Sequence, residues 1–264
     1  MIPSEATNVS YKQLDQKINR AIGKAIAQFE MIQPRDKILV AVSGGKDSLC
    51  MLHYLKSYQK KSPVKFDYIA VNVDQKQPGF DEQHMPKLFV GWNVPYKIVS
   101  QDTYSVVVDK TPEGKSYCAV CSRLRRGILY ETAKSLGCNK VALGHHLDDV
   151  LETFLLNTFF SGKLAAMPAK YQTDKEGIEV IRPLFNVREE WITAFSELNE
   201  WPIMPCNLCG SQENLQRKAM KELLSSLHGK YPKLKETSFA ALHNVDVDFL
   251  PDQRWWSEKT PSSI

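Results

Sequence analysis

The sequence predicts an α/β fold in which a doubly wound parallel sheet is covered by helices on both faces. Short apolar, β-branched runs alternate with segments of helical periodicity along most of the chain. One of these runs, "ILVAV", stops abruptly at "SGGKDS" before apolar residues resume in "LCMLHYL". Because ligands bind beyond the carboxyl ends of the strands in such sheets, we expect the functional residues to lie at that edge.

The N-terminal half supplies three expected strands and two helices. Apolar residues at helical spacing predict a helix over Asn8–Glu30, which "QPRD" interrupts before the strand Lys37–Val42. Helical periodicity resumes from Asp47 to Tyr58. The composition of Phe66–Asp74 and Tyr96–Ser100 is typical of strands, and the turn-rich "QKQPGF" follows the first of them.

The second half continues this alternation and then changes character. Its expected elements are, in order, a helix over Ser122–Gly137, a strand over Lys140–His146, a helix over Leu147–Phe160, a strand over Ile178–Leu184 and a helix over Arg188–Asn199. Gly137 can adopt the left-handed conformation that closes a last helical turn. After about Pro202 the pattern indicates a cysteine-bearing loop and a largely helical tail.

Composition limits the class of protein. The chain has 264 residues, of which 43% are hydrophobic, and its net charge of +4 is too small to establish a polyanionic partner. No apolar run approaches the ~20 residues that span a bilayer, and the N-terminus lacks the apolar stretch of a secretion signal. We therefore expect a cytoplasmic protein with no membrane partner.

The residues that follow the first strand are suited to binding an anion of phosphate type. Gly44 and Gly45 let backbone N–H groups approach a ligand without a Cβ in the way. Ser43 and Ser48 add hydroxyl donors, and the next helix adds the partial positive charge of its N-terminus. The spacing is not that of a Walker A loop. A plain strand-to-helix turn is the alternative, but one glycine would satisfy it.

Four of the six cysteines form two C-x-x-C pairs, Cys118 with Cys121 and Cys206 with Cys209. In a reducing cytosol this spacing indicates a metal, a cluster or a redox pair rather than a structural disulfide. The two pairs could converge as a four-thiolate site, and the residue types do not choose between zinc and iron–sulfur. Cys50 and Cys138 lie among apolar neighbours, so we expect both in the core.

Six motifs together resemble the tRNA 2-thiocytidine synthetase family of the PP-loop ATP pyrophosphatase superfamily. They are "SGGKDS", "VNVDQKQPGF", "C-x-x-CSRLRRGILY", "LGHHLDDVLETFLLN", "IRPL" and "PCNLCGSQ-x-NLQR", and the match runs from about Gly23 to Tyr231. Lysidine synthetase shares the loop but is not expected to carry the cysteine pairs. The resemblance implies an adenine nucleotide α-hydrolase-like fold with three parts: an N-terminal helical segment (1–34), a PP-loop nucleotide-binding domain that includes the first cysteine pair (35–200), and a helical C-terminal extension with the second pair (201–264).

The resemblance also implies which residues bind ATP and Mg²⁺. Lys46 would neutralise phosphate charge and Asp47 would hold the Mg²⁺ ion, beside a loop that retains pyrophosphate. Asp148 and Asp149 would orient the substrate base or Mg²⁺, and we expect them to be catalytic together with the first two. The remaining nucleotide-binding residues would be Ser43, Gly44, Gly45, Ser48, Val71, Asn72, Val73, Asp74, Gly144 and His145.

For the cysteines, the resemblance implies a [4Fe–4S] cluster held by three thiolates, with one iron free to carry sulfur. Cys118 and Cys121 would be two ligands, and we expect Cys209 to be the third, with Cys206 as the alternative. The implied reaction is ATP-dependent thiolation of the first cytidine of a tRNA anticodon loop. The C2 oxygen attacks the α-phosphate of ATP to form an adenylate, and sulfur then replaces it as AMP leaves.

The implied partners are a tRNA and a sulfur donor such as a cysteine desulfurase, and a homodimer is compatible with the sequence. We expect two groups of cations to meet RNA phosphates, namely Arg123, Arg125 and Arg126 after the first cysteine pair and Arg217, Lys218 and Lys221 in the tail.

Two other functions fit part of the same pattern. The chain could be a PP-loop ligase or amidating enzyme that modifies tRNA and has a structural Cys₄ zinc site. It could also be a zinc-stabilised module that binds RNA or a nucleotide without catalysis. Iron in anaerobically purified protein favours thiolation, whereas stoichiometric zinc favours either alternative.

Overall fold

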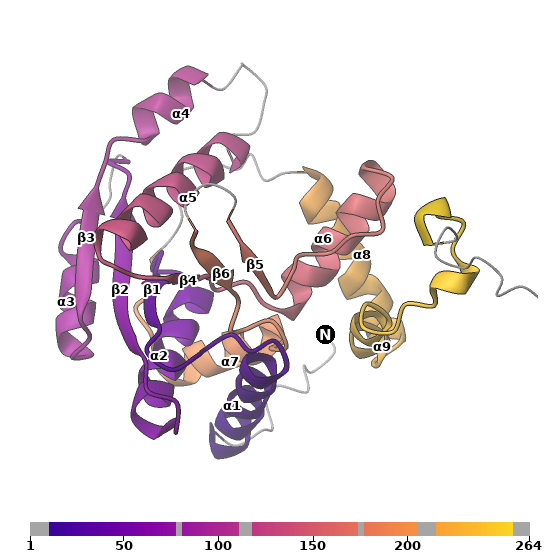
Figure 1. The fold of residues 1–264 in the computed structure, drawn as a ribbon, viewed down its shortest axis with the longest axis horizontal. Coiled ribbons are helices and arrows are strands. Elements are labelled where there is room, and N and C mark those ends of the chain that lie inside the picture. Colours follow the sequence, from indigo (N-terminus) through magenta and orange to yellow (C-terminus); the bar gives the residue numbers. More distant parts are fainter. Residues whose placement is uncertain (1–10, 78–80, 111–117, 174–176, 205–214, 256–264) are drawn as a thin grey trace, which may run out of the picture.

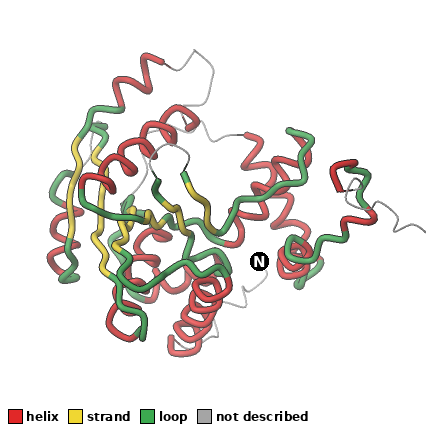
Figure 2. Tube along the Cα trace, viewed as in Figure 1, coloured by secondary structure: helices red, strands yellow, loops and turns green. Residues whose placement is uncertain are grey.

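The computed structural model describes residues 11–77, 81–110, 118–173, 177–204 and 215–255. A six-stranded sheet with the order β3-β2-β1-β4-β6-β5 lies at its centre (Figures 1 and 2). The first five strands in this order run parallel, and β5 pairs antiparallel with β6 at the edge. The predicted α/β fold with a largely parallel sheet is therefore confirmed.

The elements have the following bounds. The strands are β1 Lys37–Ala41, β2 Asp67–Asp74, β3 Tyr96–Ser100, β4 Lys140–Ala142, β5 Lys170–Gln172 and β6 Glu179–Ile181. The helices are α1 Tyr11–Gln28, α2 Lys46–Lys61, α3 His84–Gly91, α4 Tyr104–Lys110, α5 Cys118–Ser135, α6 Leu147–Phe160, α7 Glu189–Leu198, α8 Leu215–Lys230 and α9 Leu234–Ala241. Two single 3₁₀ turns follow at Val247–Phe249 and Gln253–Trp255.

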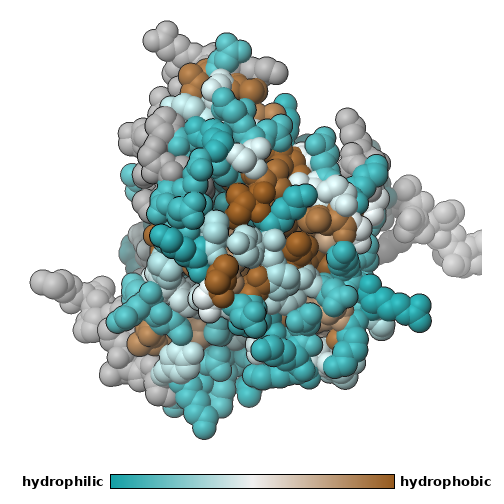
Figure 3. All heavy atoms as spheres, turned by 90° about the vertical axis from the view of Figure 1, so that its left-hand side faces the viewer, coloured by the Kyte–Doolittle hydropathy of each residue, from teal (hydrophilic) through white to brown (hydrophobic). Residues whose placement is uncertain are grey.

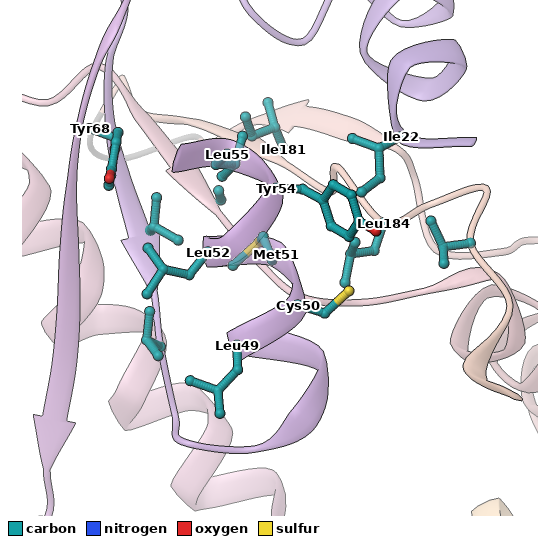
Figure 4. Packing of buried hydrophobic residues seen from close by; sticks show 14 of the residues in the cluster. Ile22, Leu49, Cys50, Met51, Leu52, Tyr54, Leu55, Tyr68, Ile181 and Leu184 are labelled. Atoms are coloured by element: carbon teal, nitrogen blue, oxygen red, sulfur yellow. The ribbon is translucent and has the colours of Figure 1, made fainter. Parts of the chain in front are cut away.

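Helices cover both faces of the sheet and bury its apolar side chains. On one face α2 packs against β1, α7 packs on α2, and α1 packs on α7. Figure 4 shows this core, in which Leu52 and Leu55 of α2 are fully buried near Tyr68 of β2 and Ile181 of β6. On the other face α5 packs on β1, β2 and β4. This burial is the main stabilising contribution to the fold.

Cys50 and Cys138 lie in the two cores, as the sequence predicts. Cys50 belongs to the cluster beneath α2, and Cys138 belongs to the cluster beneath α5. Burial raises the pKa of both thiols above their ordinary value, which keeps them protonated. These two cysteines are therefore packing residues and suitable controls for the C-x-x-C pairs.

The order of the strands defines one crevice. From β1 the chain proceeds outward to β2 and β3, and it then returns to β4 on the other side of β1. The direction of winding thus reverses between β1 and β4. The loops that leave the carboxyl ends of these two adjacent strands therefore diverge there. In open α/β sheets this reversal is where ligands bind. The "SGGKDS" loop follows β1 directly.

Three elements were not predicted from the sequence, namely α3, α4 and β5. Helix α4 is rich in valine, which has a modest helix propensity, and β5 contains only three residues. A short loop joins β5 to β6, and so short a connection can join only antiparallel strands. The predicted strand Lys140–His146 is shorter in the structure, because the chain leaves the sheet after Ala142.

The C-terminal helices pack on α6 rather than on the sheet. Leu147 and Leu151 of α6 form a small apolar cluster with Leu224 of α8, and Leu234 and Phe239 pack against it. This arrangement brings α8 and α9 next to the end of α6 that begins at the crevice (Figure 1).

Strand β3 forms the edge of the sheet opposite to β5. Figure 3 views the molecule from this side, and its surface there is mostly hydrophilic with hydrophobic residues in separate patches. Lys97 is exposed on β3, and a charged edge strand disfavours pairing with a further strand. Within the described segments, no helix combines the length and apolarity needed to cross a bilayer.

Candidate active site

A cavity of about 500 Å³ opens at the carboxyl ends of β1, β2 and β4. Three segments that are distant in sequence meet there: the loop after β1, the end of β2 and the loop after β4. Helix α5 forms a further wall. The lining residues are Ala41, Val42, Ser43, Gly45, Asp47, Ser48, Val71, Val73, Ser122, Arg125, Arg126, Leu129, Leu143, Gly144, His145, Asp149, Met167, Arg182 and Arg217.

The two serines of the loop after β1 organise its backbone. Ser48 Oγ accepts a hydrogen bond from Ser43 N–H at 3.2 Å and donates to the carbonyl of Gly45 at 2.9 Å. Ser43 Oγ lies 3.5 Å from the Gly45 nitrogen, from which it accepts a hydrogen bond. Gly45 caps α2 without a side-chain hydrogen bond, so the helix presents free N–H groups toward the cavity. The loop is preformed for an anion.

Gly44 has the conformation and the neighbours that demand glycine. Its φ of +89° is rarely adopted by L side chains, and a Cβ there would lie 2.9–3.1 Å from three side-chain atoms of Met204. The carbonyl of Gly44 also accepts a hydrogen bond from Met204 N–H at 3.0 Å. The loop is thus clamped to the end of the segment that follows α7.

We predict that Gly44→Ala lowers the free energy of unfolding by about 1–2 kcal/mol, from backbone strain and displacement of Met204. Gly45→Ala is the matched control, because a Cβ at Gly45 meets only Ser43 Oγ at 3.6 Å. Urea unfolding followed by circular dichroism gives both values. Equal stability of the two variants would contradict the role assigned to the Gly44 conformation.

Lys46 and Asp47 form an ion pair, in which Asp47 lines the cavity and Lys46 is not among the described lining residues. Lys46 Nζ lies 2.9 Å from Asp47 Oδ1 and 3.1 Å from Glu189 Oε1 of α7. Burial alone would lower the pKa of Lys46, but the two carboxylates raise it above its ordinary value. Glu189 also pairs with Lys221 at 2.9 Å, and its two lysine partners outweigh burial and lower its pKa to about 2. Lys46, Glu189 and Lys221 are therefore charged at neutral pH.

The end of β2 forms one wall of the cavity and carries residues that the resemblance assigns to nucleotide binding. Val71 and Val73 line the cavity, whereas Asn72 is buried and donates from Nδ2 to the carbonyl of Val42 at 2.8 Å. Asn72 therefore ties β2 to the start of the loop. Asp74 accepts hydrogen bonds from Lys76 N–H and Ser100 Oγ and pairs with Lys76. It shapes the end of β2 and is not among the described lining residues of the cavity.

Gly144, His145 and His146 connect the loop after β4 to the loop after β1. A Cβ on Gly144 would lie 3.2 Å from the Asp47 carbonyl group and from Ser48 N, so a side chain there would press against the backbone of the loop after β1. His145 lines the cavity, and burial lowers its pKa to about 4, so it is neutral at pH 7. His146 caps α6 by accepting from Asp149 N–H, and its Nε2 lies 3.8 Å from Asp47 Oδ1.

The structure separates the two aspartates that the sequence placed together. Asp149 lines the cavity and lies 3.2 Å from Arg217 of α8. Asp148 instead accepts a hydrogen bond at Oδ2 from the N–H of Glu189, the first residue of α7, at 2.7 Å, and its Oδ1 pairs with Lys235 Nζ of α9 at 2.6 Å. Burial opposes its ionisation, but these two partners outweigh burial and hold the pKa of Asp148 below its ordinary value. Consecutive helical residues point in different directions, which separates the two roles.

Four arginines line the cavity. Arg125 and Arg126 come from α5, Arg217 comes from α8, and Arg182 follows β6. Arg217 is paired with Asp149 and Glu152, and this leaves α8 with fewer free cations than the sequence suggested. Lys221 of the same helix is likewise paired with Glu189.

Arg182 differs from the other three arginines in its burial. It is 6% exposed, stacks over the Tyr171 ring at 5.3 Å and donates to the carbonyl of Pro168 at 2.6 Å and to His145 Nδ1 at 3.4 Å. No described carboxylate forms an ion pair with it. Sequence reasoning assigned no role to Arg182, although "IRPL" was one of the motifs. A buried cation without an anionic partner is the signal that only the structure provides.

The first cysteine pair begins α5. Cys121 is buried, and its Sγ lies 3.2 Å from Gln75 Oε1 at the end of β2. The next residue, Ser122, lines the cavity. Cys118 is the first residue of α5, one helical turn earlier. Cys206 and Cys209 lie outside the described residues. The described segment that precedes them ends at Met204, whose N–H donates to the carbonyl of Gly44. The helix that carries the first cysteine pair therefore adjoins the cavity through Ser122.

Comparisons with known proteins agree with this geometry. Residues 12–221 match a family model described as a PP-loop domain. The chain is 51% identical over 251 residues to the tRNA-cytidine(32) 2-sulfurtransferase of Tolumonas auensis, covering 95% of this chain and 83% of the relative. The same enzyme from Vibrio cholerae serotype O1 is 51% identical over 249 residues, covering 94% and 80%.

Among solved structures, the chain is similar to the U34-tRNA thiolase NcsA from Methanococcus maripaludis, whose structure includes its [4Fe–4S] cluster. The TM-score is 0.71 at 23% sequence identity, and the match covers 89% of this chain and 79% of the thiolase. At this identity the similarity concerns the fold.

Proposed function

Since the chain belongs to the PP-loop family and, within it, to the tRNA-cytidine(32) 2-sulfurtransferases, we propose that its cavity uses ATP to replace the C2 oxygen of a tRNA cytidine with sulfur. The substrate is the first cytidine of the anticodon loop. One observation carries this proposal: the glycine loop, the end of β2 and the N-terminal end of α5 border one cavity. This arrangement supports a reaction in which the glycine loop binds phosphates and the start of α5 delivers sulfur to the same base.

The loop after β1 binds the phosphates of ATP. The N–H groups at the start of α2 and the hydroxyls of Ser43 and Ser48 hold the pyrophosphate portion, while backbone groups of Val71 and Val73 contact adenine. Lys46 neutralises charge that develops when the C2 oxygen of the cytidine attacks the α-phosphate. Pyrophosphate leaves, and the oxygen becomes part of a good leaving group, AMP.

Asp47 fits the role of a Mg²⁺ ligand. Its partly exposed carboxylate lines the cavity, and among the described residues Lys46 is the only lysine or arginine that forms an ion pair with it. Hard carboxylate oxygens beside phosphates are the usual protein ligands of Mg²⁺. Asp149, across the same cavity, orients the target base through its link to Arg217.

The cysteine-bearing segments fit an iron–sulfur cluster. Cys118 and Cys121 are separated by one helical turn, and backbone N–H groups at a helix N-terminus favour thiolates. Together with Cys209, or with Cys206 as the alternative, they would hold a [4Fe–4S] cluster. When bound, such a cluster supplies the sulfur atom. The protein's own contribution is to bring the activated base to that end of α5 and to exclude water from the adenylate.

Arg182 is the anion-binding residue of the cavity in this proposal. A guanidinium without a carboxylate partner among the described residues is satisfied by an anion, and the phosphates of ATP are the anion that this cavity receives.

We predict that Arg182→Met weakens ATP binding about tenfold or more, whereas the free energy of unfolding changes by less than about 1 kcal/mol, because Met retains much of the packing against Tyr171. Isothermal titration with ATP and urea unfolding measure the two effects. Unchanged ATP affinity would exclude Arg182 from the nucleotide site.

The partners follow from the reaction. The protein binds tRNA through its anticodon loop, and a sulfur donor such as a cysteine desulfurase replenishes the sulfur atom that each turnover consumes. A tRNA-modifying enzyme of this kind works in the cytoplasm. Arg123, Arg125 and Arg126 of α5 lie closest to the cluster end of the cavity and contact the phosphates of the loop.

The experiment that tests the function uses cells that lack 2-thiocytidine in their tRNA. Expression of this chain is expected to restore 2-thiocytidine, measured by mass spectrometry of digested tRNA, and anaerobically purified protein is expected to be brown and to contain iron. Colourless protein with stoichiometric zinc and no 2-thiocytidine would instead support the ligase or the zinc-stabilised module.

A further inference from the structure

A second cavity, of about 930 Å³, lies between α1 and α9. Figure 1 shows these two helices on the same side of the molecule. We call this cavity the α1–α9 groove. Its lining residues are Gln13, Gln16, Lys17, Arg20, Ala21, Lys24 and Gln28 of α1, Glu236, Phe239 and Ala240 of α9, and Leu147, Asn186, Trp191, His243 and Asn244. None of these residues contributes to the nucleotide cavity.

The α1 wall of the groove is basic. Lys17, Arg20 and Lys24 follow one another at spacings of three and four residues and therefore share one helical face. All three are exposed, and in the described part of the chain no carboxylate forms an ion pair with them. Lys17 Nζ lies over the Trp191 ring at 5.9 Å, which fixes one of the charges at the groove wall. The stripe attracts an anion.

The cations of α8 provide the contrast. Arg217 pairs with Asp149 and Glu152, and Lys221 pairs with Glu189. These charges are already compensated within the protein, so they offer less to an external polyanion. The α1 stripe has no such compensation and would release its counterions when a polyanion binds.

The floor and the α9 wall offer contacts that a base or a ribose uses. Trp191, Phe239 and His243 expose aromatic rings to the groove, on which bases can stack. Two acceptors, Asn186 Oδ1 and Glu236 Oε2, are buried without a hydrogen-bond partner among the described residues.

The groove is connected to the active site through the start of α6. Leu147 lines the groove, and its N–H donates to the carbonyl of Val187 at 2.9 Å. The residue before it, His146, approaches Asp47, and Asp149 lines the nucleotide cavity. One polynucleotide could therefore contact the groove while one of its nucleotides occupies the active site.

We propose that the α1–α9 groove binds the sugar-phosphate backbone of the substrate tRNA outside the loop nucleotide that reacts, and this rests on the proposed function. Two other occupants, the chain's own residues 1–10 and a second copy of the chain, complement the positive charge of the groove less well. Residues 1–10 carry a single charged side chain, that of Glu5. A second copy of the chain that used the same groove would place like charges against each other.

The test compares the full-length protein with Lys17→Gln/Arg20→Gln/Lys24→Gln, in which a good helix former replaces each cation. Lys60→Gln/Lys61→Gln/Lys65→Gln is the matched control. It removes the same charge from exposed positions at the end of α2 and before β2, at the amino ends of the strands. Binding of unmodified tRNA is measured across a salt series, together with ATP affinity and thiolation at saturating tRNA.

The groove variant is expected to bind tRNA about tenfold or more weakly at ~0.1 M salt, and the slope of log K against log salt is expected to fall by about two to three. ATP affinity and the rate at saturating tRNA should be unchanged, and the control variant should resemble the wild type.

Equal tRNA affinity and slope in the groove variant and the wild type would overturn the groove proposal and leave the proposed function standing. Absence of thiolation by the wild type would overturn the function instead. Light scattering detects the remaining case, in which the groove variant changes its association state and the groove is an interface between copies.

Discussion

Cys121→Ser is expected to lose iron and to abolish thiolation while it retains the fold and ATP binding. Serine has nearly the same shape and preserves the hydrogen bond to Gln75 Oε1, but it does not supply a thiolate. Cys118→Ser should behave in the same way. Iron and zinc content, visible absorbance under anaerobic conditions and the 2-thiocytidine content of tRNA are the measurements.

The matched control is Cys138→Ala. Cys138 is buried in the core beneath α5, so its replacement is expected to cost about 1–2 kcal/mol of stability and to leave iron in place. Loss of iron from this variant as well would show that the measurement responds to destabilisation rather than to ligation.

Variants at the second cysteine pair distinguish a cluster held by three thiolates from a metal held by four. If three thiolates hold the cluster, one of the alanine variants at Cys206 and Cys209 retains iron, and we expect it to be Cys206→Ala. If Cys209→Ala retains iron instead, our assignment of the third ligand fails and the mechanism stands. Four equal losses of metal, with zinc in the parent protein, would mean a structural Cys₄ site and would end the sulfur-transfer proposal.

Asp47→Asn is expected to reduce kcat/KM for ATP at least 100-fold, since the amide keeps the shape of the side chain but removes the charge that we propose as the ligand of Mg²⁺. The lost pair with Lys46 is partly exposed, so stability should change by less than about 1 kcal/mol. Glu190→Gln is the control, because that carboxylate pairs with Arg188 away from the nucleotide cavity. Near-normal 2-thiocytidine in cells that contain only Asp47→Asn would contradict the assignment of the loop.

Gly45→Val tests the same loop by steric means. A Cβ at Gly45 has only Ser43 Oγ near it, at 3.6 Å, so the protein itself tolerates the change. A branched side chain there would occupy part of the cavity in which the phosphates bind. We therefore expect the effect on activity to match that of Asp47→Asn, and an unimpaired Gly45→Val enzyme would move the phosphates elsewhere.

The alternation of strands and helices is encoded locally, and it was predictable for that reason. The buried runs of β1 and β2, the helical periodicity of α2 and α6 and the glycine that ends α5 depend on near neighbours in the sequence. Gly137 has a φ of +66°, as its predicted role in closing the helix requires. The short strand β5 and the valine-rich helix α4 lack such local signals, because tertiary contacts rather than propensity hold them.

Residue types at short spacing were enough to predict the fold class, the position of the glycine loop after the first strand and the two cysteine pairs. Which side chains meet depends instead on the tertiary structure. It turned Asp149 into the cavity and Asp148 toward α9, brought the buried Arg182 to His145, and linked Lys46 to Lys221 through Glu189. It also left the cations of α1 without carboxylate partners in the described chain. These pairings depend on the order of the strands and on the packing of distant helices, which no local spacing encodes.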